Sequence, residues 1–218
     1  IFPAMMNAVI ALTALGYPVD HPAVKKALAE IDALRVEAED RIRVQPCLGP
    51  VWDTALTVTA LVEAGLPPAH PALARAGAWL LARQTRCPGD WRLKAAVAPG
   101  GWAFQFDNEY YPDVDDTALV LMALRKIRLP DEEAKIRSVA RGLGWMLALQ
   151  GRDGGWGAYD RDNNRMVFNY IPFADHGALM DPSTEDLAGR VLEALGYLGF
   201  RPDEPAAARA IAFVKAAQ

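Results

Sequence analysis

The stretch DDTALVLMALRKIRLP, residues 115–130, decides the fold because the chain repeats it. WDTALTVTALVEAGLP, residues 52–67, aligns with it without a gap at an offset of 63 residues. A third copy starts at Glu185 and Asp186 and continues through VLEALGYLGFRP, and a weaker copy, ALTALGYPVDHPAV, precedes them all. Apolar residues recur at helical spacing in each copy and Gly or Pro closes it, so each copy predicts one helix.

A second helix is predicted after each of these, and it carries an aromatic residue followed by Gln five positions later. The pairs are Trp79 with Gln84, Trp145 with Gln150, and Phe213 with Gln218. Gly-rich turns that end at Trp91 and Trp156 follow the first two pairs. We interpret these segments as structural, with the Gln side chain capping a neighbouring helix or turn. Since the third pair stops in mid-motif, we expect the chain to be part of a longer protein.

Helix pairs of roughly constant period indicate an all-α fold, in which helix-pair repeats form part of an α/α barrel, or toroid. No segment gives a convincing strand pattern. The segment RVEAEDRIRVQPCLGP, residues 35–50, breaks the apolar periodicity and is interpreted as a linker or domain boundary. We expect residues 1–46 to end a preceding helical α/α domain. Residues 47–218 are expected to belong to the α/α barrel domain that carries an acidic cluster, truncated at its C-terminus.

Composition excludes several classes of function. The net charge of −4, without a basic cluster in the sequence, argues against a nucleic-acid partner. Cys47 and Cys87 are far apart and only three histidines exist, which argues against a structural zinc site. We therefore predict no metal site, and no apolar stretch reaches transmembrane length.

Three aspartates are crowded at the start of the second copy, and the repeat separates their roles. Asp53, Asp116 and Asp186 share one repeat position, just before a predicted helix, where the simplest interpretation is an N-cap. Asp115 is not needed for capping, because its repeat equivalents are Trp52 and Glu185.

Asp113 adds a further negative charge two residues before Asp115. One interpretation of these two residues is a solvated acidic turn. The other is a general acid, because a carboxyl near other carboxylates in an apolar pocket has a raised pKa and keeps its proton. Such an acid suits a substrate without a good basic atom, for example an alkene.

Two glycine-rich turns place large aromatic residues in loops. GGWAFQFDN begins at Gly100 and GGWGAYDRDN at Gly154. The aromatic residues in these turns are Trp102, Phe104, Phe106, Trp156 and Tyr159. Their faces attract cations, which would suit a cavity, whereas the alternative is ordinary packing. We hold the packing interpretation for the tryptophans of the repeat itself, namely Trp79, Trp91, Trp145 and Trp156.

These motifs together resemble a known family. DVDDTA resembles the DxDD acid motif of squalene–hopene cyclases, and the aromatic–Gln…Gly-x-Trp segments resemble the QW repeats of triterpene cyclases. GPVWDT, PGGWAFQFDNEYYPDVDDTA, GGWGAYD and NYIPFADHGALMDPSTED also match the family, most strongly from Gly49 to Phe200. Oxidosqualene cyclases have a similar fold but carry a DCTAE acid motif, so the DxDD sequence argues against them.

The resemblance implies acid-initiated cyclisation of squalene through a carbocation cascade to hopene, or to hopanol when water is captured. It implies no metal and no organic cofactor. It also implies a monotopic protein on the cytoplasmic side of the cytoplasmic membrane, so the expected partners are squalene and a membrane surface. Residues implied at the acid site are Asp115 as proton donor, with Asp113 and Asp116 as flanking carboxylates.

Further residues fall on family positions around the cavity. Trp52, Phe104 and Tyr159 match residues that line it and stabilise cations, and Gln105 sits beside Phe104. Asp181 and Asp186 match acidic residues that support the acid site by hydrogen bonding. Arg190 departs from the histidine of a well-known family form. Because a guanidinium lowers the pKa of a carboxyl that it touches, we expect Arg190 to neutralise Asp116 or Asp113 and leave Asp115 protonated.

Two other functions fit parts of the sequence. A class II diterpene cyclase also uses DxDD, but it acts on a diphosphate and should offer basic residues and a magnesium site. A non-catalytic α/α module that binds a prenyl or lipid chain would make the DxDD motif incidental. The chain alone is expected to be inactive, with apolar surface that would be covered by the rest of the protein or by a second copy in a homodimer.

Overall fold

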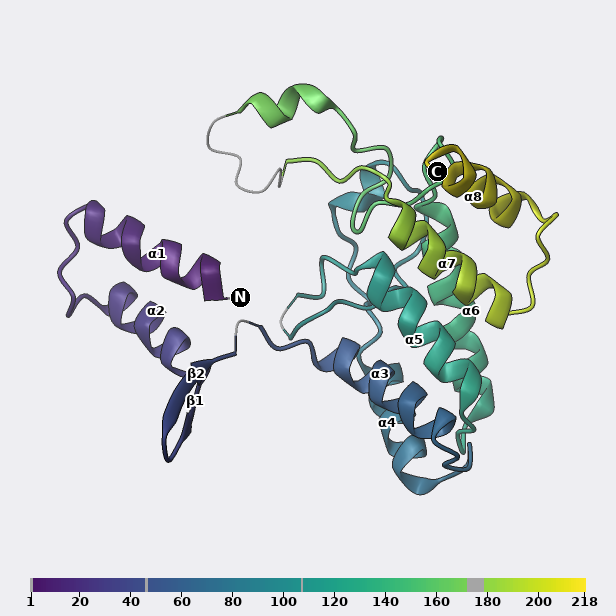
Figure 1. Cartoon of the computed structure of the whole chain (residues 1–218), viewed down its shortest axis with the longest axis horizontal. Coiled ribbons are helices and arrows are strands. Elements are labelled where there is room, and N and C mark those ends of the chain that lie inside the picture. The colour runs from purple at the N-terminus through teal and green to yellow at the C-terminus, as the bar shows by residue number, and fades with distance from the viewer. Residues whose placement is uncertain (1, 46, 107, 172–178) are drawn as a thin grey trace. The chain divides into compact units, whose positions relative to one another are not determined.

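A computed structural model describes residues 2–45, 47–106, 108–171 and 179–218 of the chain (Figure 1). Helices account for most of this part, which confirms the all-α prediction apart from one short hairpin. Contacts divide the chain into two compact units, Ile1–Gly49 and Pro50–Gln218, so the division falls inside the 35–50 segment. Whether these units correspond to domains of a longer protein stays a prediction.

The first unit contains helices α1 (Phe2–Ala14) and α2 (Pro22–Asp32), which pack on each other. Strands β1 (Arg35–Ala38) and β2 (Arg41–Val44) then form an antiparallel hairpin in which Arg35 faces Val44. The prediction that the segment lacks strands was therefore wrong. Val36, Ile42 and Val44 alternate with charged residues over only four positions in each strand, a pattern too short to distinguish from a linker.

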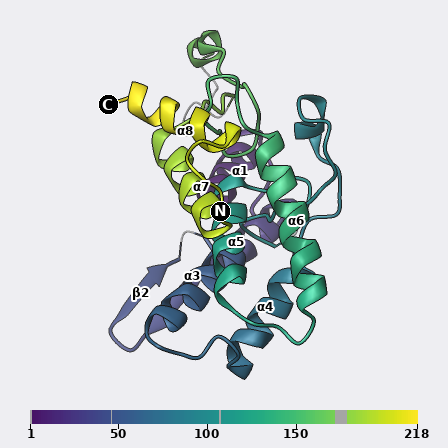
Figure 2. The same cartoon turned by 90° about the vertical axis from the view of Figure 1, so that its right-hand side faces the viewer.

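The described residues of the second unit form three helix pairs, as the repeat predicts. They are α3 (Pro50–Glu63) with α4 (Pro71–Ala82), α5 (Val114–Lys126) with α6 (Glu132–Ala148), and α7 (Glu185–Tyr197) with α8 (Pro205–Ala216). Short 3-10 helices η1 (Asp90–Leu93) and η2 (Met166–Tyr170) lie in the connections. α5 lies between α3 and α7, and the second helix of each pair packs on the first (Figures 1 and 2). This arrangement is consistent with part of a barrel, although closure into a toroid stays a prediction.

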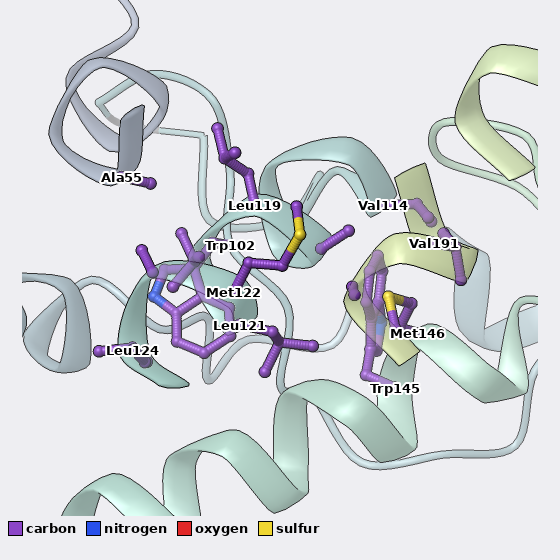
Figure 3. Close-up of a cluster of buried hydrophobic side chains, with 14 of the residues drawn as sticks. Ala55, Trp102, Val114, Leu119, Leu121, Met122, Leu124, Trp145, Met146 and Val191 are labelled. Atoms are coloured by element: carbon purple, nitrogen blue, oxygen red, sulfur yellow. The ribbon is translucent and has the colours of Figure 1, made fainter. Parts of the chain in front are cut away.

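α5 is the centre of the hydrophobic core. Its residues from Asp116 to Leu124 are all buried, because neighbouring helices and loops cover every side of it. Figure 3 shows Leu121 gathered with Trp102 and Trp145 in this core. Two polar residues, Asp116 and Thr117, are buried within the same helix, and such residues require partners or a change of charge.

The predicted role of the glutamines is confirmed for Gln84 and Gln150. Gln84 is buried and donates from Nε2 to the carbonyl oxygens of Gly100 at 2.6 Å and Ser138 at 2.8 Å. Its Oε1 accepts from Ser138 Oγ at 2.8 Å and from Arg141 Nη2 at 2.7 Å. One amide thus joins the end of α4 to the glycine turn and to α6 of the following pair.

Gln150 repeats this arrangement one pair later. Its Nε2 donates to the carbonyl oxygens of Gly154 and Ala206, both at 2.9 Å, and its Oε1 accepts from Arg209. Gly154 has φ +95°, and a side chain there would collide with the Arg209 carbonyl, so the close approach requires glycine. The contact between a glutamine and an arginine therefore occurs twice in this chain, and each time it connects consecutive helix pairs.

The tryptophan assigned to the first of these turns was wrong. Trp102, rather than Trp91, is the equivalent of Trp156: Trp102 Nε1 donates to the Leu80 carbonyl at 2.7 Å, and Trp156 Nε1 to the Met146 carbonyl at 2.8 Å. Trp91 instead packs edge-to-face on Trp145, with ring centroids 5.8 Å apart. The insertion of η1 between Gln84 and its glycine turn hides this correspondence in the sequence.

Replacing Gln84 by Ala should destabilise the protein by about 2–4 kcal/mol. The change leaves two carbonyl groups, Ser138 Oγ and the Arg141 guanidinium without their buried partner. Urea unfolding measures the effect, and Gln45→Ala is the control because the Gln45 side chain is exposed. Equal stability of the two variants would show that the buried amide contributes little.

Candidate active site

The acidic cluster is built around the start of α5. Asp113 is the N-cap: its Oδ1 accepts from the backbone N–H of Asp115 at 2.7 Å and of Asp116 at 3.3 Å. The backbone N–H of Asp113 donates to the Trp102 carbonyl at 2.8 Å. The assignment of Asp116 as the cap was wrong, because the helix starts two residues earlier and Asp116 already lies within its first turn.

Thr117 fixes this cap, and the sequence analysis did not select it. Its hydroxyl donates to the Asp113 carbonyl at 2.7 Å and accepts from the Trp102 N–H at 3.0 Å. A threonine directly after two aspartates, at the start of an apolar helical run, was the available signal in the sequence. The structure buries this residue fully. The side chain therefore joins the first turn of α5 to the glycine–tryptophan turn.

Asp53 and Asp186 are not N-caps either. α3 begins at Pro50, so Asp53 lies in its first turn, and Thr184 occupies the N-cap position of α7. Both carboxylates still lie near the positive end of a helix dipole, which favours their charge.

The structure also shifts the repeat alignment by one residue. Trp102 forms a β-bridge with Asp113, and its equivalent Trp156 forms one with Thr184. The residue two positions after each bridge is Asp115 in one repeat and Asp186 in the other, so these two are equivalent. Asp116 then corresponds to Leu187, a buried apolar residue. A carboxyl at a core position of the repeat is exceptional within the chain.

Burial changes the pKa values of two carboxyls strongly. Asp116 is 2% exposed, and its Oδ1 has no hydrogen-bond partner among the described residues. Burial, followed by the charges of Asp113 and Asp115, raises the pKa of Asp116 to about 8. Burial raises the pKa of Asp113 to about 6 against the opposing effect of its backbone hydrogen bonds. The cluster therefore retains a proton at neutral pH, and Asp116 is where the structure favours it.

Arg190 forms an ion pair with Asp115, through Nε and Oδ1. The expectation that Arg190 would avoid Asp115 and neutralise Asp113 or Asp116 was wrong, because α7 presents Arg190 one turn after Asp186 toward the first turn of α5. Burial still raises the pKa of Asp115, with Arg190 lowering it and Asp186 raising it. The Asp115 side chain is 32% exposed, so it is the accessible member of the cluster, whereas Asp116 lies beneath the surface.

The Arg190 guanidinium also contacts Trp52. Its Cζ lies 5.1 Å from the centroid of the Trp52 ring, within range of a cation–π interaction. Trp52 comes from the first turn of α3 and Asp115 from that of α5, so these contacts bring the N-terminal ends of α3, α5 and α7 together (Figure 1). The N-terminal half of α7 therefore contacts the first turns of both α3 and α5.

Asp181 organises the other side of the cluster. Its Oδ1 accepts from the Ala158 N–H at 2.8 Å, and its Oδ2 from the N–H groups of Tyr159 and Asp160, each at 2.6 Å. The turn held in this way carries Tyr159, whose hydroxyl lies close enough to Asp113 for each group to shift the pKa of the other. Burial, with the Asp113 charge, raises the pKa of Tyr159, so its hydroxyl remains a donor. Asp181 therefore supports the acid cluster through Tyr159.

The remaining predicted residues are less closely connected. Phe104 and Gln105 are half-buried in the loop after Trp102, and no hydrogen bond links Gln105 to the carboxylates in the described part of the chain. Asp186 is exposed, and a hydrogen bond with Thr184 is the main cause of its lowered pKa. Residues 172–178 of the NYIPFADHGALMDPSTED motif, and Asp107, lie outside the described residues.

Across the described ranges, no group of three or more His, Cys, Asp or Glu side chains is arranged to hold a metal ion. In the same ranges, none of the helices combines the length and hydrophobicity needed to cross a membrane.

Comparison with known proteins identifies the family. Residues 48–218 match the family described as "Squalene-hopene cyclase C-terminal domain". The chain belongs to the squalene–hopene cyclase family. Residues 1–40 match the "Squalene-hopene cyclase N-terminal domain", so both parts of the chain lie within this family.

Relatives within the squalene–hopene cyclase family extend over nearly the whole chain. A squalene–hopene cyclase of Alicyclobacillus acidocaldarius is 44% identical over 218 residues, covering 99% of this chain and 34% of that protein. A dammaradiene synthase of Dryopteris crassirhizoma is 48% identical, covering 91% of this chain and 29% of that protein. A squalene–hopene cyclase of Schizosaccharomyces japonicus is 40% identical, covering 100% of this chain and 34% of that protein. The chain thus spans about a third of the length of these relatives.

Proposed function

We propose that a full-length protein containing this chain cyclises squalene to hopene, with hopanol as the product when water is captured. The observation that carries this proposal is the buried carboxyl of Asp116, which keeps its proton near neutral pH beside two further carboxylates. An alkene has no basic atom that could accept a hydrogen bond strongly. Its protonation therefore requires an acid that is still protonated when the substrate binds. The names of the squalene–hopene cyclase relatives support the choice of substrate.

Asp115 and Asp116 act as a coupled pair in this proposal. Asp116 is too deeply buried to meet a substrate, whereas Asp115 is partly exposed at the same helix end. Because neighbouring carboxyls share protons as a unit, the pair retains one proton and Asp115 delivers it. Asp113 remains the N-cap that holds both in place. A substrate that displaces water from Asp115 would raise the pKa of that carboxyl further.

Arg190 limits the negative charge of the pair. With Asp115 ionised after proton delivery, the ion pair with Arg190 stabilises the carboxylate and hinders immediate recapture of the proton. The Trp52 ring also restricts the Arg190 side chain, so this side chain loses less conformational entropy when it pairs with Asp115. Arg190 is therefore a positioning residue in this proposal, with the proton carried by the carboxyls.

Aromatic faces would stabilise the cations that follow protonation. Trp52 approaches the acid cluster from α3, and Tyr159 approaches it from the turn held by Asp181. Phe104 lies in the loop after Trp102. Each ring offers a negative face to a cation without supplying a nucleophile that would end the cascade. We propose these three rings, with Gln105 beside Phe104, as the part of the cavity wall contributed by this chain.

The setting of the reaction is also a proposal. Squalene is apolar and partitions into membranes, so a monotopic protein at the cytoplasmic face of the membrane would receive it directly. The chemistry of proton-initiated cyclisation requires no metal or organic cofactor.

Incubation of the full-length protein with squalene, followed by product analysis, tests the proposal. Formation of pentacyclic hopene or hopanol supports it. Turnover of a C20 prenyl diphosphate in place of squalene would favour a diterpene cyclase. Binding of squalene without turnover, unchanged by loss of Asp115, would favour a non-catalytic lipid-binding module.

The 218-residue chain on its own should form no detectable hopene from squalene. A carbocation cascade needs a closed cavity that excludes water, and the relatives are about three times as long as the region matched here. The full-length protein under the same conditions is the positive control. Hopene formation by the isolated chain would show that these helix pairs suffice to enclose the substrate.

A further inference from the structure

A concave site is lined by residues other than those of the acid cluster. It has a volume of about 870 Å³ and is formed by the end of η1 with the residue after it, the glycine-rich turn after Gln150, and the loop of residues 161–165. Its lining consists of Leu93, Lys94, Arg152, Asp153, Arg161, Asp162, Asn164 and Arg165. Folding thus gathers basic residues that are spread along the sequence, where no basic cluster is visible.

The charge of this pocket is opposite to that of the whole chain. Four basic residues and two carboxylates line it, whereas the chain has a net charge of −4. One of the carboxylates, Asp153, already has two hydrogen-bond partners: its Oδ1 accepts from the Gly155 N–H at 3.0 Å and from Ser183 Oγ at 3.1 Å. The lining therefore favours an anion.

Asp162 holds two arginines side by side without occupying their donors. Its Oδ1 accepts from the Arg152 backbone N–H at 2.8 Å, and its Oδ2 lies 3.6 Å from Nε of both Arg152 and Arg161. A separation of 3.6 Å is too long for a hydrogen bond, so the carboxylate positions the two guanidinium groups by charge alone. Nε of Arg161 is buried and has no hydrogen-bond partner among the described residues.

The backbone at Asp162 supports a built site. Asp162 is the non-glycine residue with positive φ, at 56°, in the described part of the chain. Such a conformation costs free energy, and it is maintained here by the contacts of the Asp162 carboxylate with the Arg152 turn. Asp162, the residue with this backbone conformation, is also the one whose carboxylate holds Arg152 and Arg161 at the pocket wall.

We propose that this pocket binds a phosphate group. Guanidinium groups offer planar, paired donors that match phosphate oxygens, and Lys94 adds a further cation. Leu93, which is 90% exposed, lies on the same lining, so the phosphate of a phospholipid headgroup and free phosphate are two sources of the same chemistry. This inference does not rest on the cyclase proposal, because binding can be measured without turnover.

Titration of the full-length protein with inorganic phosphate at constant ionic strength tests the proposal. We expect saturable binding that becomes about tenfold weaker in Arg152→Gln and in Arg161→Gln, because each loses charged donors to the anion. Arg201→Gln is the matched control, since Arg201 pairs with Asp203 outside the pocket. Arg152 is 89% exposed, so its replacement should leave folding intact, as thermal melting can verify. Absence of saturable binding, or equal loss in the control, would overturn the proposal.

Co-sedimentation with vesicles distinguishes the two sources of phosphate. Vesicles of phosphatidylcholine alone are compared with vesicles that also contain phosphatidylglycerol. Binding that requires phosphatidylglycerol and is weakened in Arg161→Gln supports a lipid headgroup, whereas phosphate titration without such vesicle dependence supports free phosphate.

Discussion

Replacing Asp115 by Asn in the full-length protein should reduce squalene turnover by a factor of about 10²–10⁴ or more. The amide keeps the shape of the side chain but has no acidic proton to give. Asp115 is the accessible carboxyl of the cluster, and water is too weak an acid to protonate an alkene in its place. The measurement is product formation from squalene, with folding checked by thermal melting.

Asp53→Asn is the control for this experiment, because Asp53 lies in the first turn of α3, at the position that the repeat aligns with Asp116, and is exposed. It should retain substantial turnover. A well-folded Asp115→Asn protein with near-normal activity would show that Asp115 is not the proton donor. Loss of activity in both variants alike would point to a structural effect of changing charge at the helix ends.

Asp116→Asn distinguishes the coupled pair from a single donor. If Asp116 holds the retained proton, the amide that replaces it has no proton to supply to Asp115, so turnover should also fall. Arg190→Gln separates positioning from proton transfer, because it removes the charge that opposes protonation of Asp115 while leaving every carboxyl in place.

The helix pairs could be predicted from the sequence because the residues within each copy of the repeat are sufficient to specify its helices. Apolar spacing specifies a helix locally, and Gln84 and Gln150, at the ends of the first two pairs, form equivalent hydrogen bonds. The hairpin at Arg35–Val44 was missed because two strands of four residues carry almost no periodic signal. Closure of a barrel depends on helices beyond the three pairs seen here, so local patterns cannot establish it.

The carboxyls of the site were found by sequence, but their individual roles were not. The order of the three aspartates does not reveal which one caps the helix, and a shift of one residue moves Asp116 from the cap to a core position equivalent to Leu187. The pairing of Arg190 with Asp115 depends on how α7 is rotated against α5, which no single helix encodes. The phosphate pocket likewise combines three separate segments.

The stability of the full-length protein should fall as the pH rises from about 4 to about 8, and Asp116→Asn should make that fall shallower. Asp116 has a folded-state pKa of about 8, well above its value of about 4 in the unfolded chain. Between these values the folded protein binds a proton that the unfolded chain has released. The contribution of Asp116 is therefore fully present below pH 4 and is lost as the pH rises through 8, at up to about 1.4 kcal/mol per pH unit.

Urea unfolding at pH 5 and pH 8 measures this difference for the original protein and for Asp116→Asn. The comparison uses the change between the two pH values, so a constant cost of burying the amide cancels. Asp113, whose pKa is about 6, titrates in both proteins and accounts for part of the fall that remains in the variant. Asp53→Asn, in which the buried cluster is intact, should follow the original protein. If the original protein and Asp116→Asn lose stability in parallel from pH 5 to pH 8, then Asp116 is not the carboxyl that retains the proton, and the acid cluster needs a different assignment.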